Sequence, residues 1–281
     1  MYPSICPSSI LKAALTLAFA NCAVGVAAPV RTLPRPAHIV VVMEENHSYS
    51  QIIGSPDAPY INSLAAEGAS FTDSHAITHP SQPNYLALFS GSPHGVTSDS
   101  CPHTFSTANL GSELIASNLT FTGFSEGLNS PGSEECTSGE YARKHVPWTN
   151  FSDLASSVNQ PFAAFPRDFN ELPTVSWVIP DLLHDMHNGT IEEADRWLQT
   201  NLGPYIEWAR NNNSLLIVTW DENDDAPGNQ IPTIFVGAMV KRGQYSEYIT
   251  HYSVLQTIEA IYGLSYLGQS DSAKAITDVW Q

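Results

Sequence analysis

The chain has 281 residues, 42% of them hydrophobic, which is enough for one substantial core. Its 28 acidic and 11 basic residues give a formal net charge of −17 at pH 7, which argues against nucleic acid as a partner because a phosphate backbone requires positively charged contacts. An anionic small molecule would also be repelled at long range, so any phosphate chemistry here must be organised by a local cation.

The N-terminal segment has the pattern of a secretory signal peptide. Lys12 precedes a short apolar run over residues 13–20, and small residues suited to cleavage lie at Ala20 and Ala28. This run is too short to span a bilayer. We predict a signal peptide over residues 1–28, cleaved after Ala20 or Ala28, and a single domain over residues 29–281. The protein is then secreted or periplasmic, without stable membrane insertion.

Two apolar runs predict strands buried on both faces of a parallel sheet, and polar side chains follow each of them. The runs lie within His38–Asn46 and at Ser214–Trp220. Because the carboxyl ends of parallel strands meet at one edge of a sheet, the polar side chains converge there. They are Glu45, Asn46, Asp221 and Glu222. Each alone is consistent with a polar strand exit, but the pair of strands favours a divalent cation, which prefers oxygen ligands.

The segment between these strands begins with two predicted helices. The first covers residues 60–67 and ends at Gly68, and the second runs from Pro80-Ser81 to Gly91. Residues 92–150 are then rich in Ser, Gly, Pro and Thr, with a strand predicted only near residues 119–125. This composition indicates either an insertion that lies over the functional site or an ordinary surface loop.

The cysteines indicate a disulfide within this segment. Signal-peptide cleavage removes Cys6, and cleavage after Ala28 also removes Cys22, so Cys101 and Cys136 are the pair retained in either case. In an exported protein such a pair predicts a disulfide. Two free buried thiols are the alternative.

A third buried strand is predicted at residues 174–180, and it too ends in polar residues. Among them, Asp185 and His187 place an imidazole next to a carboxylate at a strand end. His187 in this position is suited to protonating a leaving group or binding substrate, and Asp185 to orienting it or joining a metal shell. His184 and His251 share part of this argument, without an assigned role.

The C-terminal part continues the alternation of strands and helices. Thr190 and Glu193 form a capping box, and the helix that follows is predicted to break at Gly203-Pro204 and to restart over residues 205–210. A strand is predicted at residues 233–240 and a helix at residues 253–262. The fold class is therefore α/β with a mainly parallel sheet.

Ser81 is the candidate nucleophile. It lies at the predicted start of a helix, where free backbone amides and the helix dipole stabilise an anion such as an alkoxide or a phosphoryl group. A simple helix N-cap is the alternative, but a metal held beside it would favour an activated alkoxide. Asn84, one turn later, is predicted to direct its amide donors at a phosphoryl oxygen or to lie on the helix surface.

These residues resemble the phosphoesterase family that contains secreted acid phosphatases and bacterial phospholipases C, within the alkaline phosphatase-like superfamily. The resemblance covers about residues 36–265, and five ordered motifs make it specific. The motifs are Glu45-Asn46-His47-Ser48-Tyr49, His79-Pro80-Ser81-Gln82-Pro83-Asn84-Tyr85, Asp185-Met186-His187 with Asp195 and Trp197, Asp221-Glu222, and Thr250-His251-Tyr252-Ser253.

The resemblance implies a three-layer α/β/α sandwich, with Ser81 as the phosphorylated nucleophile and a metal ligand. The other implied ligands are Glu45, Asn46, Asp221 and Glu222. Two-zinc members of the superfamily use an Asp-His pair where this chain has Asp221-Glu222, so we expect one divalent metal. Sulfatases are excluded, because the Cys-x-Pro-x-Arg motif is missing.

The expected function is that of a secreted, metal-dependent acid phosphatase acting on small phosphomonoesters through a phosphoserine intermediate. A phosphodiesterase or phospholipase C is the alternative, favoured if aromatic residues such as Trp148 and Phe151 form an exposed membrane-docking surface. A catalytically silent secreted binding protein is a third possibility, although the candidate nucleophile and ligands are all present.

Overall fold

The computed structural model describes residues 1, 3 and 33–281, and Leu33–Gln281 form one compact unit. The predicted signal peptide, with Cys6 and Cys22, lies outside the described residues except for residues 1 and 3. Among the helices that the structure describes, none is long and apolar enough to cross a membrane.

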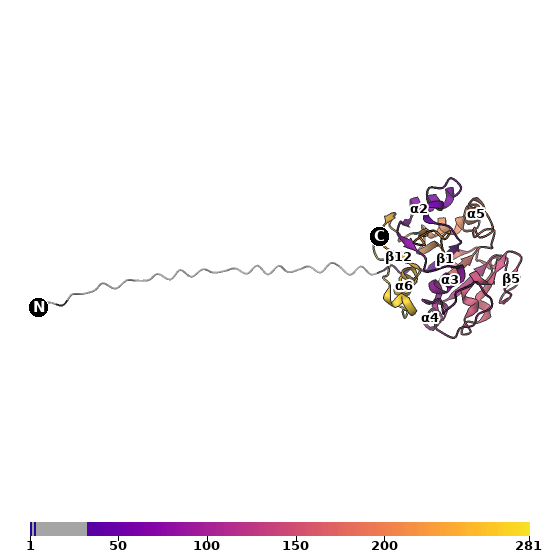
Figure 1. Cartoon of the computed structure of the whole chain (residues 1–281), viewed down its shortest axis with the longest axis horizontal. Helices are drawn as coiled ribbons and strands as arrows, with labels where there is room; N and C mark the ends of the chain where they lie inside the picture. Colours follow the sequence, from indigo (N-terminus) through magenta and orange to yellow (C-terminus); the bar gives the residue numbers. More distant parts are fainter. Residues whose placement is uncertain (2, 4–32) are drawn as a thin grey trace. The chain divides into compact units, whose positions relative to one another are not determined.

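The core of the unit is an eight-stranded, mainly parallel sheet (Figure 1). Its strands follow the order β11 (Gly243–Tyr245), β2 (Ala69–Phe71), β10 (Thr233–Gly237), β9 (Ser214–Trp220), β1 (His38–Glu44), β8 (Val175–Ile179), β4 (Phe121–Ser125) and β7 (Asn159–Pro161). Only β10 runs against its neighbours, β9 and β2. The predicted class, α/β with a mainly parallel sheet, is confirmed.

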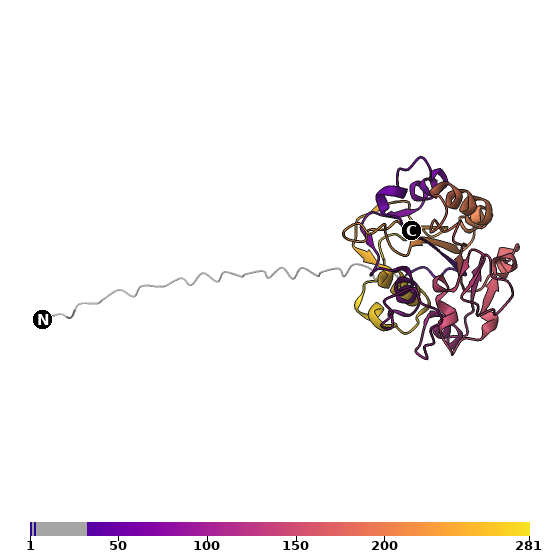
Figure 2. The ribbon, with the colours of Figure 1, turned by 45° about the vertical axis from the view of Figure 1, so that its right-hand side comes forward.

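Helices cover both faces of this sheet, which gives the three-layer arrangement seen in Figures 1 and 2. Alternate residues of β1 belong to two separate cores. Ile39 and Val41 pack in the core that includes α3 (Ser81–Ser90), α4 (Leu110–Ala116) and α6 (His251–Tyr262). Val40 and Val42 pack in the core with α1 (Tyr49–Ile52), α2 (Pro59–Glu67) and α5 (Ile191–Ala209). This explains why residues 39–43, at the centre of the strand, are all apolar.

Short elements complete the unit. β3 (Ser74–His75) pairs with β12 (Ile249–Thr250), and β5 (Thr137–Ser138) pairs with β6 (Tyr141–Ala142). The 3₁₀ turns are η1 (Arg143–His145), η2 (Pro147–Asn150), η3 (Ser156–Val158), η4 (Phe162–Ala164), η5 (Phe169–Glu171) and η6 (Gly268–Ser272).

The predicted helix break at Gly203-Pro204 is wrong, because α5 continues through Pro204 to Ala209. An interior proline costs about 3 kcal/mol. Leu198, Leu202 and Ile206 are fully buried on one side of the helix, and each such burial contributes roughly 1.5–3 kcal/mol. Packing against the sheet therefore outweighs the local penalty. The capping box of Thr190 and Glu193 at the start of α5 is confirmed.

Two other boundaries differ from the sequence prediction. β10 ends at Gly237 rather than at residue 240, because the amide of Ala238 leaves the ladder and donates to the carbonyl of Ala209 at 3.2 Å. α6 begins at His251 rather than at residue 253, and the hydroxyl of Ser253 accepts from the amide of Thr250 at 3.2 Å.

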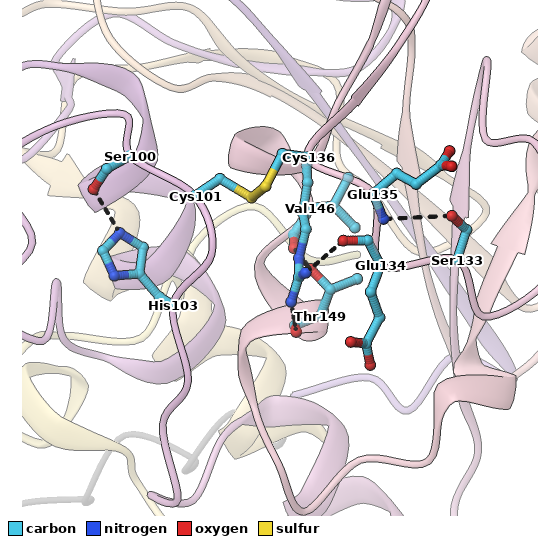
Figure 3. Close-up of a disulfide and its surroundings, with 10 residues drawn as sticks. Ser100, Cys101, His103, Ser133, Glu134, Glu135, Cys136, Val146 and Thr149 are labelled. Carbon is cyan, nitrogen blue, oxygen red and sulfur yellow. Dashed lines mark hydrogen bonds between the residues drawn. A yellow bond between two sulfur atoms is a disulfide. The ribbon is translucent and has the colours of Figure 1, made fainter.

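A disulfide between Cys101 and Cys136 ties the insertion together, as predicted (Figure 3). The guanidinium of Arg143 donates to the carbonyls of Glu134 and Thr149, both at 2.7 Å, and holds the chain on both sides of η1. The segment is therefore an ordered part of the unit.

The aromatic side chains proposed for membrane docking are buried. Trp148 is 1% exposed and Phe151 is 3% exposed, and both rings pack against Phe89 of α3. Gly123 of β4 is required for this packing, because a Cβ at that position would lie 2.1 Å from the Trp148 ring. The suggestion that these two aromatics face a membrane is therefore wrong.

Candidate active site

The ends of β1 and β9 meet at one edge of the sheet. The two strands pair in parallel, with Glu44 opposite Trp220, so the residues that follow them emerge side by side. The backbone amide of Asn46 donates to Asp221 Oδ1 at 3.1 Å. Asn46 has φ +57°, a left-handed conformation that asparagine tolerates better than most residues. The parallel pairing of β1 with β9 therefore brings the predicted oxygen ligands together.

Ser81 lies among these carboxylates. It is the first residue of α3 and is 2% exposed. Its hydroxyl lies 3.0 Å from Glu45 Oε2 and 3.2 Å from Glu222 Oε1, where it is placed to donate to either oxygen. The N-cap position of α3 is Pro80, and no side chain caps the helix there. The hydroxyl is thus directed at the carboxylates rather than used as an N-cap.

The site concentrates negative charge in a buried volume. Burial, and then the charges of Asp221 and Asp185, raise the pKa of Glu45 well above its usual range. Burial raises the pKa of Asp221 to about 6, and burial together with the charge of Asp221 raises that of Glu222 to about 8. Such groups favour either protonation or a bound cation.

The donor set fits a divalent metal. Asp221 Oδ2 is buried without a hydrogen-bond partner, so one carboxylate oxygen is left available at the centre of the cluster. Hard divalent cations bind several carboxylate, amide and hydroxyl oxygens of this kind. Glu45, Asn46, Ser81, Asp221 and Glu222 could therefore supply the ligands. The identity of the metal is not defined by these residues.

His145 is a site residue that the sequence prediction missed. Its Nε2 lies 3.1 Å from Glu45 Oε1, and its Nδ1 lies 3.1 Å from Asp185 Oδ2. Glu45 Oε1 also accepts the hydroxyl of Tyr85 at 2.7 Å, and the Tyr85 ring stacks on the imidazole. Burial lowers the pKa of His145 well below its usual range. The available signal was Arg143-Lys144-His145, a basic run in a strongly acidic chain.

Asp185 contacts the ring of His145, whereas the sequence predicted that it would orient the ring of His187. Asp185 Oδ1 accepts the backbone amide of His187 at 2.8 Å, while Oδ2 faces the His145 ring. The His187 ring instead places Nε2 3.1 Å from the ammonium nitrogen of Lys144. The ammonium also contacts Asp99 Oδ2 at 2.8 Å. The orienting role predicted for Asp185 therefore shifts from the His187 ring to His145 and to the His187 backbone.

Asn84 uses its amide for backbone contacts. Its Oδ1 accepts from the amides of Ile77 and Thr78, at 3.0 and 3.1 Å. Its Nδ2 donates to the carbonyls of Thr78 and Pro80, at 2.8 and 3.2 Å. The side chain is fully buried, so it is not on the helix surface either. Its donors hold the turn that precedes Ser81.

Three histidines whose roles were open surround the carboxylates. His79 Nδ1 lies 2.7 Å from Glu222 Oε2, and His47 Nδ1 lies 2.9 Å from the carbonyl of Glu45. His251 Nε2 lies 2.7 Å from the carbonyl of Asp221, and burial lowers its pKa to about 4. These rings fix the segments that carry the carboxylates. His75 pairs instead with Asp73, at 2.8 Å.

Among the residues that the structure describes, two groups of side chains have donor atoms within 4.8 Å of one another, close enough to hold a metal ion. The first comprises Glu45, His145 and His187, and so overlaps the site around Ser81. The second comprises Glu126, Asp181 and His184. In the second group, His184 Nδ1 lies 2.9 Å from Glu126 Oε2 and 3.0 Å from Asp181 Oδ1.

The sheet and its two helical layers have the fold of solved structures in the alkaline phosphatase superfamily. A solved structure of this superfamily from Vibrio parahaemolyticus has a TM-score of 0.60 with 14% identity, covering 88% of this chain and 72% of that chain. Phosphonate monoester hydrolase of Agrobacterium radiobacter has a TM-score of 0.56 with 12% identity, covering 82% and 74%. These likenesses establish the fold.

The chain belongs to the Phosphoesterase family, whose model matches residues 55–265. It is 49% identical to a phosphatidylinositol-3-phosphatase of Mycobacterium tuberculosis, over all of this chain and 95% of that protein. It is 26% identical to an acid phosphatase of Aspergillus fumigatus, over 77% of this chain and 53% of that protein. The chain therefore spans about half the length of this fungal relative. The predicted enzyme class, a phosphoric ester hydrolase, is confirmed, which argues against a catalytically silent binding protein.

Proposed function

We propose that the protein is a metal-dependent phosphomonoesterase that works through a phosphoserine intermediate. The contact of Ser81 Oγ with Glu45 and Glu222 carries this proposal, because it places a buried hydroxyl beside oxygens able to take its proton. In the first step, Oγ forms a bond to phosphorus and the leaving oxygen departs, while the hydroxyl proton passes to a carboxylate. Water then hydrolyses the phosphoserine.

The remaining residues of the site bind and orient. Glu45, Asn46, Asp221 and Glu222 would hold a divalent metal together with Ser81, and such an ion stabilises an alkoxide and neutralises phosphoryl oxygens. His145 fixes Glu45 against Asp185. His187 and Lys144 supply nitrogen donors next to this cluster and are placed to bind the phosphoryl group or to protonate the leaving oxygen.

The preferred substrate is a phosphomonoester. The acid phosphatase relatives support small monoesters. The Mycobacterium tuberculosis relative supports the 3-phosphate of phosphatidylinositol as a second candidate, which is also a phosphomonoester. The burial of Trp148 and Phe151 removes the observation that would have favoured a phospholipase C.

We further propose that the protein is exported. The signal-like pattern of residues 1–28 and the disulfide between Cys101 and Cys136 support this, because disulfides persist in oxidising compartments.

The test compares metal-depleted with reconstituted enzyme on p-nitrophenyl phosphate and bis-p-nitrophenyl phosphate, with phosphatidylinositol 3-phosphate as a third substrate. We expect chelation to abolish turnover, one divalent cation to restore it, and the monoester to exceed the diester at least about tenfold, or about 1.4 kcal/mol. Full activity after verified metal removal would refute metal dependence. Faster cleavage of the diester would establish a phosphodiesterase instead.

A further inference from the structure

A carboxylate from the insertion lies against two hydrogen-bond donors beside the nucleophile. Asp99 precedes the disulfide residue Cys101 by two positions. Its Oδ1 accepts the backbone amide of Gln82 at 3.0 Å, and its Oδ2 accepts the ammonium of Lys144 at 2.8 Å. The Asp99 side chain is 29% exposed and that of Lys144 is 18% exposed, so the contact is shielded but reachable from solvent.

Both donors belong to the immediate surroundings of the proposed reaction. Gln82 follows Ser81 directly at the start of α3. Lys144 also lies 3.1 Å from Nε2 of His187, which itself groups with Glu45 as a possible metal-binding set. An amide and an ammonium next to a nucleophile are the donors that a phosphoryl group requires.

Asp99 is unfavourable for an anionic substrate in two ways. It occupies donors that phosphoryl oxygens would use, and its negative charge repels an anion that approaches them. A phosphate entering the site must therefore displace a monovalent carboxylate. The cost of this displacement is the same for a monoester and a diester, but the charge of Asp99 repels a dianionic monoester about twice as strongly as a monoanionic diester at the same distance.

We propose that Asp99 is a specificity-determining residue that competes with the substrate phosphoryl group for the Gln82 amide and the Lys144 ammonium, and so weakens the binding of phosphate and dianionic monoesters more than that of monoanionic diesters. This inference rests on the proposed function. The disulfide at Cys101 keeps the competing carboxylate on the insertion close to its partners.

The test replaces Asp99 with Asn and with Ala and measures two quantities in metal-loaded enzyme at constant ionic strength. They are the dissociation constant of inorganic phosphate, by calorimetry, and the kinetic constants for p-nitrophenyl phosphate and bis-p-nitrophenyl phosphate. We expect both variants to bind phosphate roughly three- to tenfold more tightly, to lower KM for the monoester similarly, and to raise the monoester-to-diester ratio of kcat/KM.

Matched variants isolate the mechanism. Asp153→Asn makes the same charge change at an exposed carboxylate just after the insertion, which accepts from Asn109, and should leave phosphate affinity unchanged. Lys144→Met should weaken phosphate binding, and in this background Asp99→Asn should have little further effect, since the two residues act as a pair.

Unchanged or weaker phosphate binding in both folded Asp99 variants would overturn the inference and show that the carboxylate only positions its partners. An unchanged substrate ratio would overturn its role in specificity. The proposed function is judged separately, by turnover of p-nitrophenyl phosphate in the wild-type enzyme.

Discussion

Replacing Ser81 with Ala removes the proposed nucleophile while disturbing little else. Glu45 keeps its contacts with Tyr85 at 2.7 Å and His145 at 3.1 Å, and Glu222 keeps its contact with His79 at 2.7 Å. Because the hydroxyl has one proton, it donates to one carboxylate at a time. We therefore expect a stability loss of about 1–2 kcal/mol, and a melting temperature lower by about 2–8 °C.

The expected loss of activity is much larger. Without Oγ no phosphoserine forms, so turnover should fall by at least about 10⁴-fold, or about 5 kcal/mol of transition-state stabilisation. The assay measures turnover of p-nitrophenyl phosphate, the melting temperature and the bound metal content of the same preparations.

Ser90→Ala provides a matched control on the same helix. Ser90 is 3% exposed, and its hydroxyl donates to the carbonyl of Leu86 at 2.8 Å, so its removal should cost similar stability but leave turnover intact. If Ser81→Ala retained more than about a tenth of wild-type turnover, a loss below about 1.4 kcal/mol, the phosphoserine mechanism would be wrong and water would be the attacking group.

Glu45→Ala and Asp221→Ala should abolish metal binding and activity together, because each removes a proposed metal ligand; elemental analysis that finds full metal content in either variant would contradict the ligand assignment. Cys101→Ser should lower the free energy of unfolding by about 3–4 kcal/mol, because the bond closes a loop with a sequence separation of 35 residues. Denaturant titration of this variant, with reduced wild type as the control, checks the value, and an unchanged midpoint would argue against the link to Cys136. Burial raises the pKa of Glu259 from 4.5 to about 7, so its protonated form stabilises the fold fully below pH 4.5, and this contribution is lost as pH rises through 7. The free energy of unfolding is measured at pH 4.5 and at pH 8. The difference between these two values should be smaller by up to about 3 kcal/mol in Glu259→Gln than in wild type, and identical differences would refute the assignment.

The sequence by itself determined the parts of this protein that are encoded by local patterns. Residues 39–43, at the centre of β1, are all apolar because both faces of the strand are buried, so the strand could be predicted without knowledge of the fold. The run at β9 was predicted with the same bounds that the structure has. Because parallel strands end at a common edge, the convergence of Glu45 with Asp221 followed from the two runs alone.

The tertiary structure decided where local signals conflict or where residues far apart in the chain meet. Proline at position 204 predicts a break, but the helix continues because its other face is buried against the sheet. His145 and Lys144 lie in a segment without periodicity, and nothing local shows that they reach Glu45 and His187. These contacts depend on how the insertion folds back over the sheet edge, which only the packing of the whole domain fixes.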